Sequence, residues 1–525
     1  MTLQRILALL FFFSLLFTTA PLHSQSLEEE VEQAMLEATR YMVEEVSTNG
    51  GYVNHYRTDF SRQWAELETY DTQITIQPPA GTVGMGNLFL DAYKATGEEY
   101  YYEAASKVAE ALIWGQHEAG GWHYLVDFAG DRSLKEYYDT IGANAWGFEE
   151  YYHYYGNATF DDSVTAGAAT FLLRIYLEKL DPAFKPALDK AIDFVMESQY
   201  PIGGWPQRYP LMYEFSKNGK ADYTSFHTFN DNVIRNNIQF LIDCYVALGE
   251  ERFLDPIRRG MNFYLITQQG NPQAGWGLQY NMELEPAHAR SYEPASIRPS
   301  TTYSHAMLLM EFYQLTGDRK FLARIPDAIE WLERSRLTGE ATEGGRYTHA
   351  GHYEIGTNRP IYNHRSGTGV LDGEYWWDYN DENPIRHYGQ KTSIDIDRLK
   401  EEYERVSALS PEEAMANSPL KVGEYKGESL PQQDIDLGFS LSDEVPSRSA
   451  ARELIRSLDD HYRWITTGER ISNPYTVSED GKPSNTAMRS DASGSGMPDQ
   501  TDQEYISIRT YIQNMNLLIN YLTNR

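Results

Sequence analysis

The chain has 525 residues, a formal net charge of −31 and a single cysteine, and 41% of its residues are hydrophobic. So negative a surface repels nucleic acid and anionic membranes, so neither is an expected partner. One cysteine excludes disulfide bonds within the chain, and packing of a large core must hold the fold together.

The first segment has the layout of a secretory signal. A short charged start precedes an apolar run over residues 6–17, which is followed by small residues and a polar stretch. This order is typical of a cleaved signal peptide, and such a run is too short to cross the roughly 30 Å of a bilayer core. We expect residues 1–24 to be removed and the mature protein to be a secreted monomer, extracellular or periplasmic, with no membrane anchor.

One structural unit recurs from residue 25 onward. A helix ends in a glycine turn, a second amphipathic helix follows, and a glycine and an aromatic residue then open a loop. The turns contain Gly97, Gly249 and Gly317, which suit helix C-caps, and the loops reach their aromatic residue at Tyr52, Trp122, Trp205 and Trp276. Repeated helical hairpins predict an all-α fold, an α/α toroid over residues 25–400 whose loops form one groove.

The last part of the chain is less regular. Residues 411–449 and 472–503 are polar and rich in turn formers, so we expect long loops there. The apolar segment 504–522 predicts a final helix that docks on the body. Residues 401–525 are therefore interpreted as a helical and loop extension packed on the toroid.

Four segments resemble a known enzyme family. They read Thr159-Phe-Asp-Asp-Ser-Val-Thr165, then Ser198-Gln-Tyr-Pro-Ile-Gly-Gly-Trp-Pro-Gln-Arg-Tyr-Pro210 with His227-Thr-Phe-Asn-Asp-Asn232, then Glu285-Pro-Ala-His-Ala-Arg-Ser-Tyr-Glu-Pro294, and Tyr353-Glu-Ile-Gly-Thr-Asn-Arg-Pro-Ile-Tyr-Asn-His-Arg-Ser-Gly367. Their order is similar to that in the pectate lyases of polysaccharide lyase family ten. The resemblance implies β-elimination of an acidic, uronate-containing polysaccharide to 4,5-unsaturated products, with Ca²⁺ as the cofactor.

That reaction sets clear chemical demands. The C5 proton lies next to an ionised carboxylate, so metal or arginine must neutralise this carboxylate and a base must lie near C5. By the resemblance, Asp161 and Asp231 correspond to calcium-site acids, and Asn232 adds a neutral oxygen ligand. Each aspartate also precedes an apolar run, so a helix N-cap is the competing interpretation.

The resemblance also assigns the arginines. Arg290 corresponds to the catalytic base, an unusual role because the guanidinium pKa is above about 12. On spacing alone, a salt bridge from Arg290 to Glu285 or Glu293 fits as well. Arg365 corresponds to a substrate-carboxylate ligand, and Arg359 fits a structural or a functional role equally. The other substrate-binding candidates are Trp205, Arg208, Tyr209 and His227.

Two departures from the family pattern affect the expected substrate. Gly351 stands where the family has a second substrate arginine, and residues 82–127 form an additional repeat. A different polyuronate such as ulvan is therefore an alternative substrate, with His123, His227 or Tyr209 as the base. An inverting glycoside hydrolase with two carboxylates and a non-catalytic glycan-binding protein are further alternatives.

Overall fold

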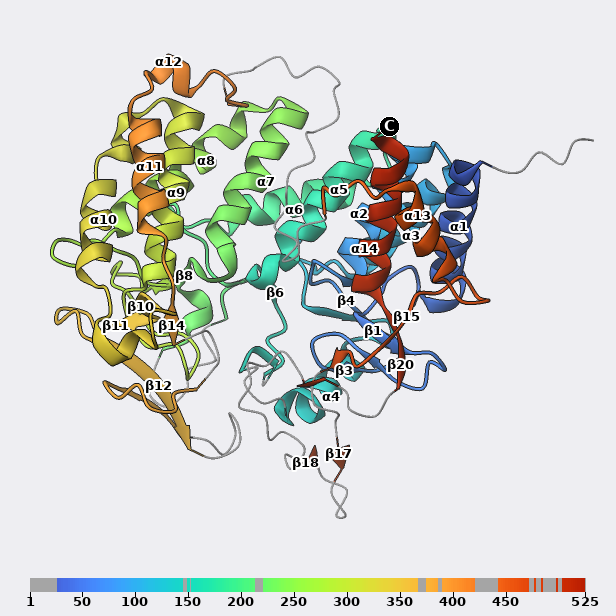
Figure 1. Ribbon diagram of the computed structural model, residues 1–525, viewed down its shortest axis with the longest axis horizontal. Coiled ribbons are helices and arrows are strands. Elements are labelled where there is room, and N and C mark those ends of the chain that lie inside the picture. The colour runs from blue at the N-terminus through green and yellow to red at the C-terminus, as the bar shows by residue number, and fades with distance from the viewer. Residues whose placement is uncertain are drawn as a thin grey trace, which may run out of the picture.

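The computed structural model describes residues 26–144, 149–151, 153–212, 221–366, 374–385, 390–420, 442–471, 476–477, 483–484, 497–498 and 503–524. The signal peptide expected at residues 1–24 lies outside this part. The described chain is predominantly helical, which confirms the predicted helical fold (Figure 1). In these ranges no helix is both long and apolar enough to cross a membrane.

The helices are α1 (Leu27–Tyr41), α2 (Gly81–Thr96), α3 (Glu99–Gly115), α4 (Asp131–Thr140), α5 (Val164–Lys179), α6 (Lys185–Glu197), α7 (Val233–Leu248), α8 (Leu254–Thr267), α9 (Pro299–Thr316), α10 (Ile325–Arg334), α11 (Ile396–Ser407), α12 (Pro411–Ala414), α13 (Arg448–Arg456) and α14 (Ile508–Thr523). The pairs α2 and α3, α5 and α6, α7 and α8, and α9 and α10 pack as hairpins. Helix α5 packs against α2 of the preceding hairpin and against α7 of the following one. The last two hairpins meet through α8 and α9. Figure 1 shows the resulting row of helices.

Short strands lie beside the helix ends, which the all-α prediction did not include. They are β1 (His55–Arg57), β2 (Gln63–Trp64), β3 (Glu68–Thr69), β4 (Gln73–Thr75), β5 (Leu125–Asp127), β6 (Ala158–Thr159), β7 (Arg208–Tyr209), β8 (His227–Thr228), β9 (Gln279–Tyr280), β10 (His349–Ala350), β11 (His352–Tyr353), β12 (Pro360–Ser366), β13 (Glu374–Asp378), β14 (Lys391–Thr392), β15 (Ile465–Thr467), β16 (Arg470–Ile471), β17 (Thr476–Val477), β18 (Pro483–Ser484), β19 (Met497–Pro498) and β20 (Glu504–Ser507). The sheets have the antiparallel orders β15-β20-β1-β2-β3, β11-β12-β13, β4-β5, β6-β7, β8-β9, β10-β14, β16-β19 and β17-β18.

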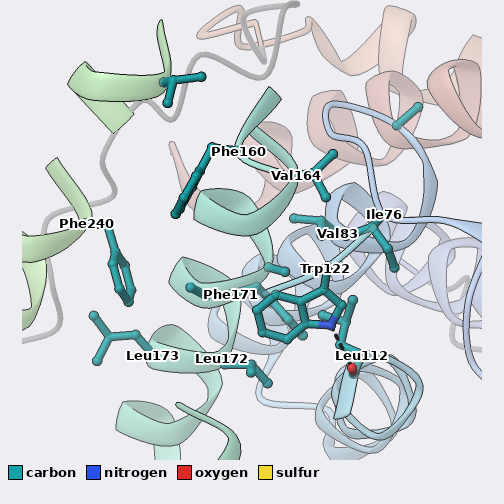
Figure 2. Packing of buried hydrophobic residues seen from close by; sticks show 14 of the residues in the cluster. Ile76, Val83, Leu112, Trp122, Phe160, Val164, Phe171, Leu172, Leu173 and Phe240 are labelled. Carbon is teal, nitrogen blue, oxygen red and sulfur yellow. Dashed lines mark hydrogen bonds between the residues drawn. The ribbon is translucent and has the colours of Figure 1, made fainter. Parts of the chain in front are cut away.

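The recurring tryptophans lock each hairpin to its loop. The indole Nε1 of Trp122 donates to the carbonyl of Leu112 at 2.8 Å, and Trp205 bonds Val195 at the same distance. Figure 2 shows Trp122 beside Phe171, Leu172 and Leu112, within the buried apolar core. These rings bury a large apolar surface while satisfying their only polar atom, so the repeated motif builds the core.

A second repeated contact joins each loop to the next unit. The backbone N–H of Thr159 donates to the carbonyl of Trp122, and Thr228 does the same with Trp205. The glycine two residues before Trp205 has a φ of 112°, and a Cβ on this Gly203 would lie 2.1 Å from the carbonyl oxygen of Arg259. Only glycine fits so close to a neighbouring backbone. The loops are thereby held at the same end of the hairpins, next to the short strands.

The C-terminal segment returns to the N-terminal helices. The predicted final helix is confirmed, but it starts at Ile508 because residues 504–507 pair with β1 as strand β20. Helix α14 packs against α1 and α2, and Figure 1 shows it beside the N-terminal helices. A boundary after residue 400 would cut α11, which packs on α9 and α10. Within the expected loop 411–449, the structure forms α12 and the start of α13.

Candidate functional site

Two short bends carry the predicted metal acids at the starts of neighbouring helices. The 3-10 bend η4 (Asp161–Ser163) leads into α5, and η6 (Asn230–Asn232) leads into α7. In each bend the last two residues have positive φ, 47° and 59° in η4 and 48° and 58° in η6. Such non-glycine residues are strained by about 1–3 kcal/mol each, and this strain clusters at functional sites. Because the bends contact each other, Asp161, Asp162 and Asp231 come together.

The carboxyl groups of Asp161 and Asp231 face each other. Helices α5 and α7 have Ser163 and Asn232 as their N-caps, and neither forms a side-chain capping bond. The two aspartates lie within hydrogen-bonding reach of one another, so they do not act as simple helix caps. In the described part of the chain, Oδ1 of Asp161 is buried and has no hydrogen-bond partner. A buried acceptor of this kind is suited to coordinate a cation or to accept a hydrogen bond from a bound water.

Arg290 lies in a cage of three carboxylates. Its Nε donates to Glu150 at 2.9 Å, its Nη2 donates to Asp161 at 2.7 Å, and its Nη1 is 3.4 Å from Glu293. The side chain is only 1% exposed. The ion pair to Glu293 confirms one of the contacts that spacing allowed. The bonds to Glu150 and Asp161 bring together segments that are 140 and 129 residues apart.

The site holds more acid than its arginine can neutralise. Burial and the charges of Asp161 and Glu150 raise the pKa of Asp162 to about 7. Burial, with Asp161 and Asp162, raises the pKa of Asp231 well above its ordinary value. Burial alone would also raise the pKa of Asp161, but Arg290 and hydrogen bonds more than offset it, and the net shift is downward. A cation would remove this mutual repulsion.

The donor set fits a hard cation. Asp161 and Asp231 supply carboxylate oxygens, and among the described residues Oδ1 of Asp161 is buried without a hydrogen-bond partner. Asn232, which follows Asp231 in the sequence, supplies an exposed side-chain amide. Across the described ranges, no three His, Cys, Asp or Glu side chains are already arranged as a metal-binding group. Calcium accepts carbonyl, water and ligand oxygens in addition to carboxylates. Two acids and an amide therefore leave coordination positions for other oxygen ligands.

Comparison with known families decides the class of the protein. Residues 149–391, somewhat less than half of the chain, match the family model described as pectic acid lyase. The protein is a polysaccharide lyase. The matched range contains both bends, the three carboxylate partners of Arg290 and every predicted site residue except the alternative base His123.

Solved structures that are similar to the lyase have low sequence identity to it. A family 10 polysaccharide lyase from Cellvibrio cellulosa is 19% identical, with a TM-score of 0.36 over 52% of this chain and 84% of that chain. A mutant of that protein in complex with trigalacturonic acid gives the same identity and TM-score over 53% and 86%. A sugar epimerase from a ruminal bacterium is 11% identical, with a TM-score of 0.40 over 95% and 99%. The comparison with curated proteins gives no match.

Of the two predicted substrate arginines, Arg365 lies on β12 of the hairpin of β12 and β13, and Arg359 directly precedes β12. Arg365 is half-buried on β12 and lies opposite Tyr375 of β13. The Tyr375 ring is 6.0 Å from that of Tyr292, two residues after Arg290. The hairpin of β12 and β13 thus lies beside the loop that carries Arg290 in the lyase. Arg359 is exposed, and its guanidinium carbon is 3.3 Å from the ring centre of Tyr379.

Three other signature residues face the interior. Trp205 is fully buried, so its ring offers no face for a sugar. His227 is 1% exposed between Phe263 and Tyr200, and burial lowers its pKa to about 4. Tyr209 is half-buried, and its ring packs against Phe194. These positions give Trp205 and His227 packing roles.

Several residues of the site were not predicted from the sequence. Glu150 binds Arg290, Glu149 accepts from the backbone N–H of Ser291, and Tyr124 donates to Asp161. Asp162 occupies the same place in η4 that Asp231 occupies in η6, and this likeness of Phe160-Asp-Asp-Ser-Val164 to Phe229-Asn-Asp-Asn-Val233 was a usable signal. Nothing in the local sequence marks Glu149 or Glu150.

Proposed function

We propose that the lyase cleaves a uronate-containing glycan, polygalacturonate or a related polyuronate, by β-elimination to 4,5-unsaturated products. The observation that carries this proposal is the buried Arg290 joined to the facing pair Asp161 and Asp231. Such a centre places a guanidinium and a cation site within reach of the same sugar carboxylate. We further propose that the helical hairpins form an α/α toroid with this centre in its groove, and that the enzyme is a monomer secreted by means of residues 1–24.

The proposed cation is Ca²⁺, held by Asp161, Asp231 and Asn232. When bound, it supplies positive charge that neutralises the substrate carboxylate and makes the C5 proton more acidic. The protein atoms prepare this site by geometry: η4 and η6 hold the carboxylates together despite their repulsion. The strained backbone and the packed tryptophan loops keep them from moving apart.

Arg290 is the proposed base, as the family resemblance implies. Its three carboxylate partners favour the charged guanidinium. The base form therefore requires Asp161, Glu150 and Glu293 to turn to other partners. Until then the same guanidinium binds an oxyanion, a role for which its planar donors are well suited. Arg365, on the adjoining hairpin, is proposed to bind a further substrate carboxylate.

Gly351 favours one second candidate, a lyase acting on a sulfated uronate polymer such as ulvan. The family's second substrate arginine is missing there, and the carbonyl of Gly351 instead accepts a hydrogen bond from Arg298 at 3.2 Å. A changed set of carboxylate ligands suits a changed arrangement of acidic groups on the glycan.

The direct test follows ultraviolet absorbance of the mature protein with polygalacturonate and with ulvan, each with calcium and with a chelator. Elimination leaves a conjugated unsaturated uronate that absorbs, whereas hydrolysis does not. A calcium-dependent rise on polygalacturonate supports the proposal, and a rise on ulvan alone supports the second candidate. Reducing ends without absorbance contradict both. Arg405→Gln serves as a control because it removes an exposed ion pair with Glu402, outside the proposed ligand set.

A further inference from the structure

Arg208 is a buried cation with no ion pair among the described residues. Its side chain is 1% exposed, and Nη1 and Nη2 have no hydrogen-bond partner in the described part of the chain. The guanidinium carbon lies 4.1 Å from the ring centre of Tyr155 and 5.2 Å from that of Tyr124. Aromatic faces attract a cation, but weakly compared with the loss of its hydration. The rings of Tyr155 and Tyr124 therefore flank the guanidinium without satisfying Nη1 and Nη2.

Among the described residues, neither Nη1 nor Nη2 of Arg208 forms a hydrogen bond with a carboxylate. The charge of Asp161 influences Arg208, but the Oδ2 atom of Asp161 is bonded to Arg290 and Tyr124 instead. Strand β7 pairs Arg208 with Thr159, two residues before Asp161. Arg208 is therefore fixed beside the proposed active centre, with two nitrogen donors left over.

Other unpartnered polar atoms surround this arginine. Both ring nitrogens of His123 and the hydroxyl of Tyr138 are buried and have no hydrogen-bond partner among the described residues. The His123 ring lies 6.1 Å from that of Tyr138 and stacks on Tyr154 at 5.6 Å. Burial and the charge of Arg208 lower the pKa of His123, so its imidazole is neutral and can donate one hydrogen bond. A cation and two neutral donors thus lack an acceptor.

We propose that Arg208, His123 and Tyr138 form an anion subsite that binds the carboxylate of the uronate next to the one at the Arg290 centre. This inference rests on the proposed function. It assigns to Arg208 the clamp that Gly351 cannot supply, and to the additional repeat, which contributes His123, a part in substrate recognition. Because the subsite is enclosed, binding must displace some of the tyrosine side chains that surround it.

The test measures binding separately from turnover. Trigalacturonate and its methyl ester are titrated by calorimetry, in the presence of chelator, into the wild type and into Arg208→Gln, Arg208→Lys and His123→Phe. Arg174→Gln is the matched control, because it removes a half-buried arginine whose ion pair with Asp91 joins α5 to α2. Near-ultraviolet circular dichroism follows the packing of the surrounding tyrosine side chains, and Tm reports folding.

We expect Arg208→Gln to weaken trigalacturonate binding by about tenfold or more, the loss of a charge-assisted contact. Arg208→Lys and His123→Phe should show smaller losses, and the ester should bind equally weakly to all proteins. Equal affinity of the wild type and both Arg208 variants, with only Tm lowered, would show a structural role and overturn the subsite. A sulfated ligand that depends on Arg208 when trigalacturonate does not would also overturn it. Absence of unsaturated product from the wild type counts against the proposed function, whereas unchanged affinity in folded variants counts against the subsite alone.

Discussion

Replacing Arg290 with glutamine should destabilise the protein strongly and in a pH-dependent way. The substitution leaves Glu150, Asp161 and Glu293 buried around a neutral side chain. Removing one partner of a buried ion pair costs about 3–5 kcal/mol, because the remaining charge stays desolvated. We expect a loss of that size in the free energy of unfolding at neutral pH.

The sign of the pH dependence follows from the carboxyl groups. Burial already raises the pKa of Glu150 and Glu293 in the folded protein, and Arg290 opposes the shift. Without Arg290 these folded-state pKa values rise further above those of the unfolded chain. A raised acid pKa contributes stability at low pH that disappears as pH rises through the folded value. The deficit of Arg290→Gln should therefore shrink as pH falls from neutral toward about 5.

Urea unfolding followed by circular dichroism at both pH values measures this effect. The control is Arg405→Gln, which removes an exposed ion pair with Glu402 and should change stability by less than about 0.5 kcal/mol. A deficit for Arg290→Gln below about 1 kcal/mol, or one that is equal at the two pH values, would refute the caged arrangement.

Three other changes have defined outcomes. Asp231→Ala should abolish the increase in Tm that calcium gives the wild type, and an undiminished increase would remove Asp231 from the ligand set. Arg365→Gln should raise KM for polygalacturonate about tenfold with little change in Tm; an unchanged KM would assign Arg365 a structural role. Gly203→Ala places a Cβ 2.1 Å from the Arg259 carbonyl oxygen at a positive φ, so urea unfolding should show a loss of more than about 1 kcal/mol, and full stability would mean that the loop adapts.

Repetition made the helical part of the fold predictable. Each glycine turn and each Gly-Trp loop meets a local structural requirement that the sequence makes visible. Gly203 is needed for a positive φ, and Trp205 fills the core. The short strands were missed because a pair of two residues, such as β6 and β7, has no alternation to detect. Strand β20 was included in the predicted final helix because its apolar residues continue into α14.

The site was predictable only where the sequence holds local signals. The motifs identified Asp161, Asp231 and Arg290, and the structure brings these three residues together. Glu150 was missed, because a contact across 140 residues has no local pattern. Trp205 and His227 were interpreted as substrate ligands, since a motif is the same whether its side chains face a groove or the core. The exposed Trp376 and Trp377 on β13 were not singled out at all.

The measurement that tests the central claim most directly is mass spectrometry of trigalacturonate digested in water labelled with heavy oxygen. Elimination breaks the glycosidic bond without adding water. We predict calcium-dependent products that include an unsaturated sugar and carry no label at the cleaved bond. Their summed mass should equal that of trigalacturonate, one water less than the summed mass of the hydrolysis products. Saturated products that carry the label would contradict β-elimination and the roles proposed for Asp161, Asp231 and Arg290.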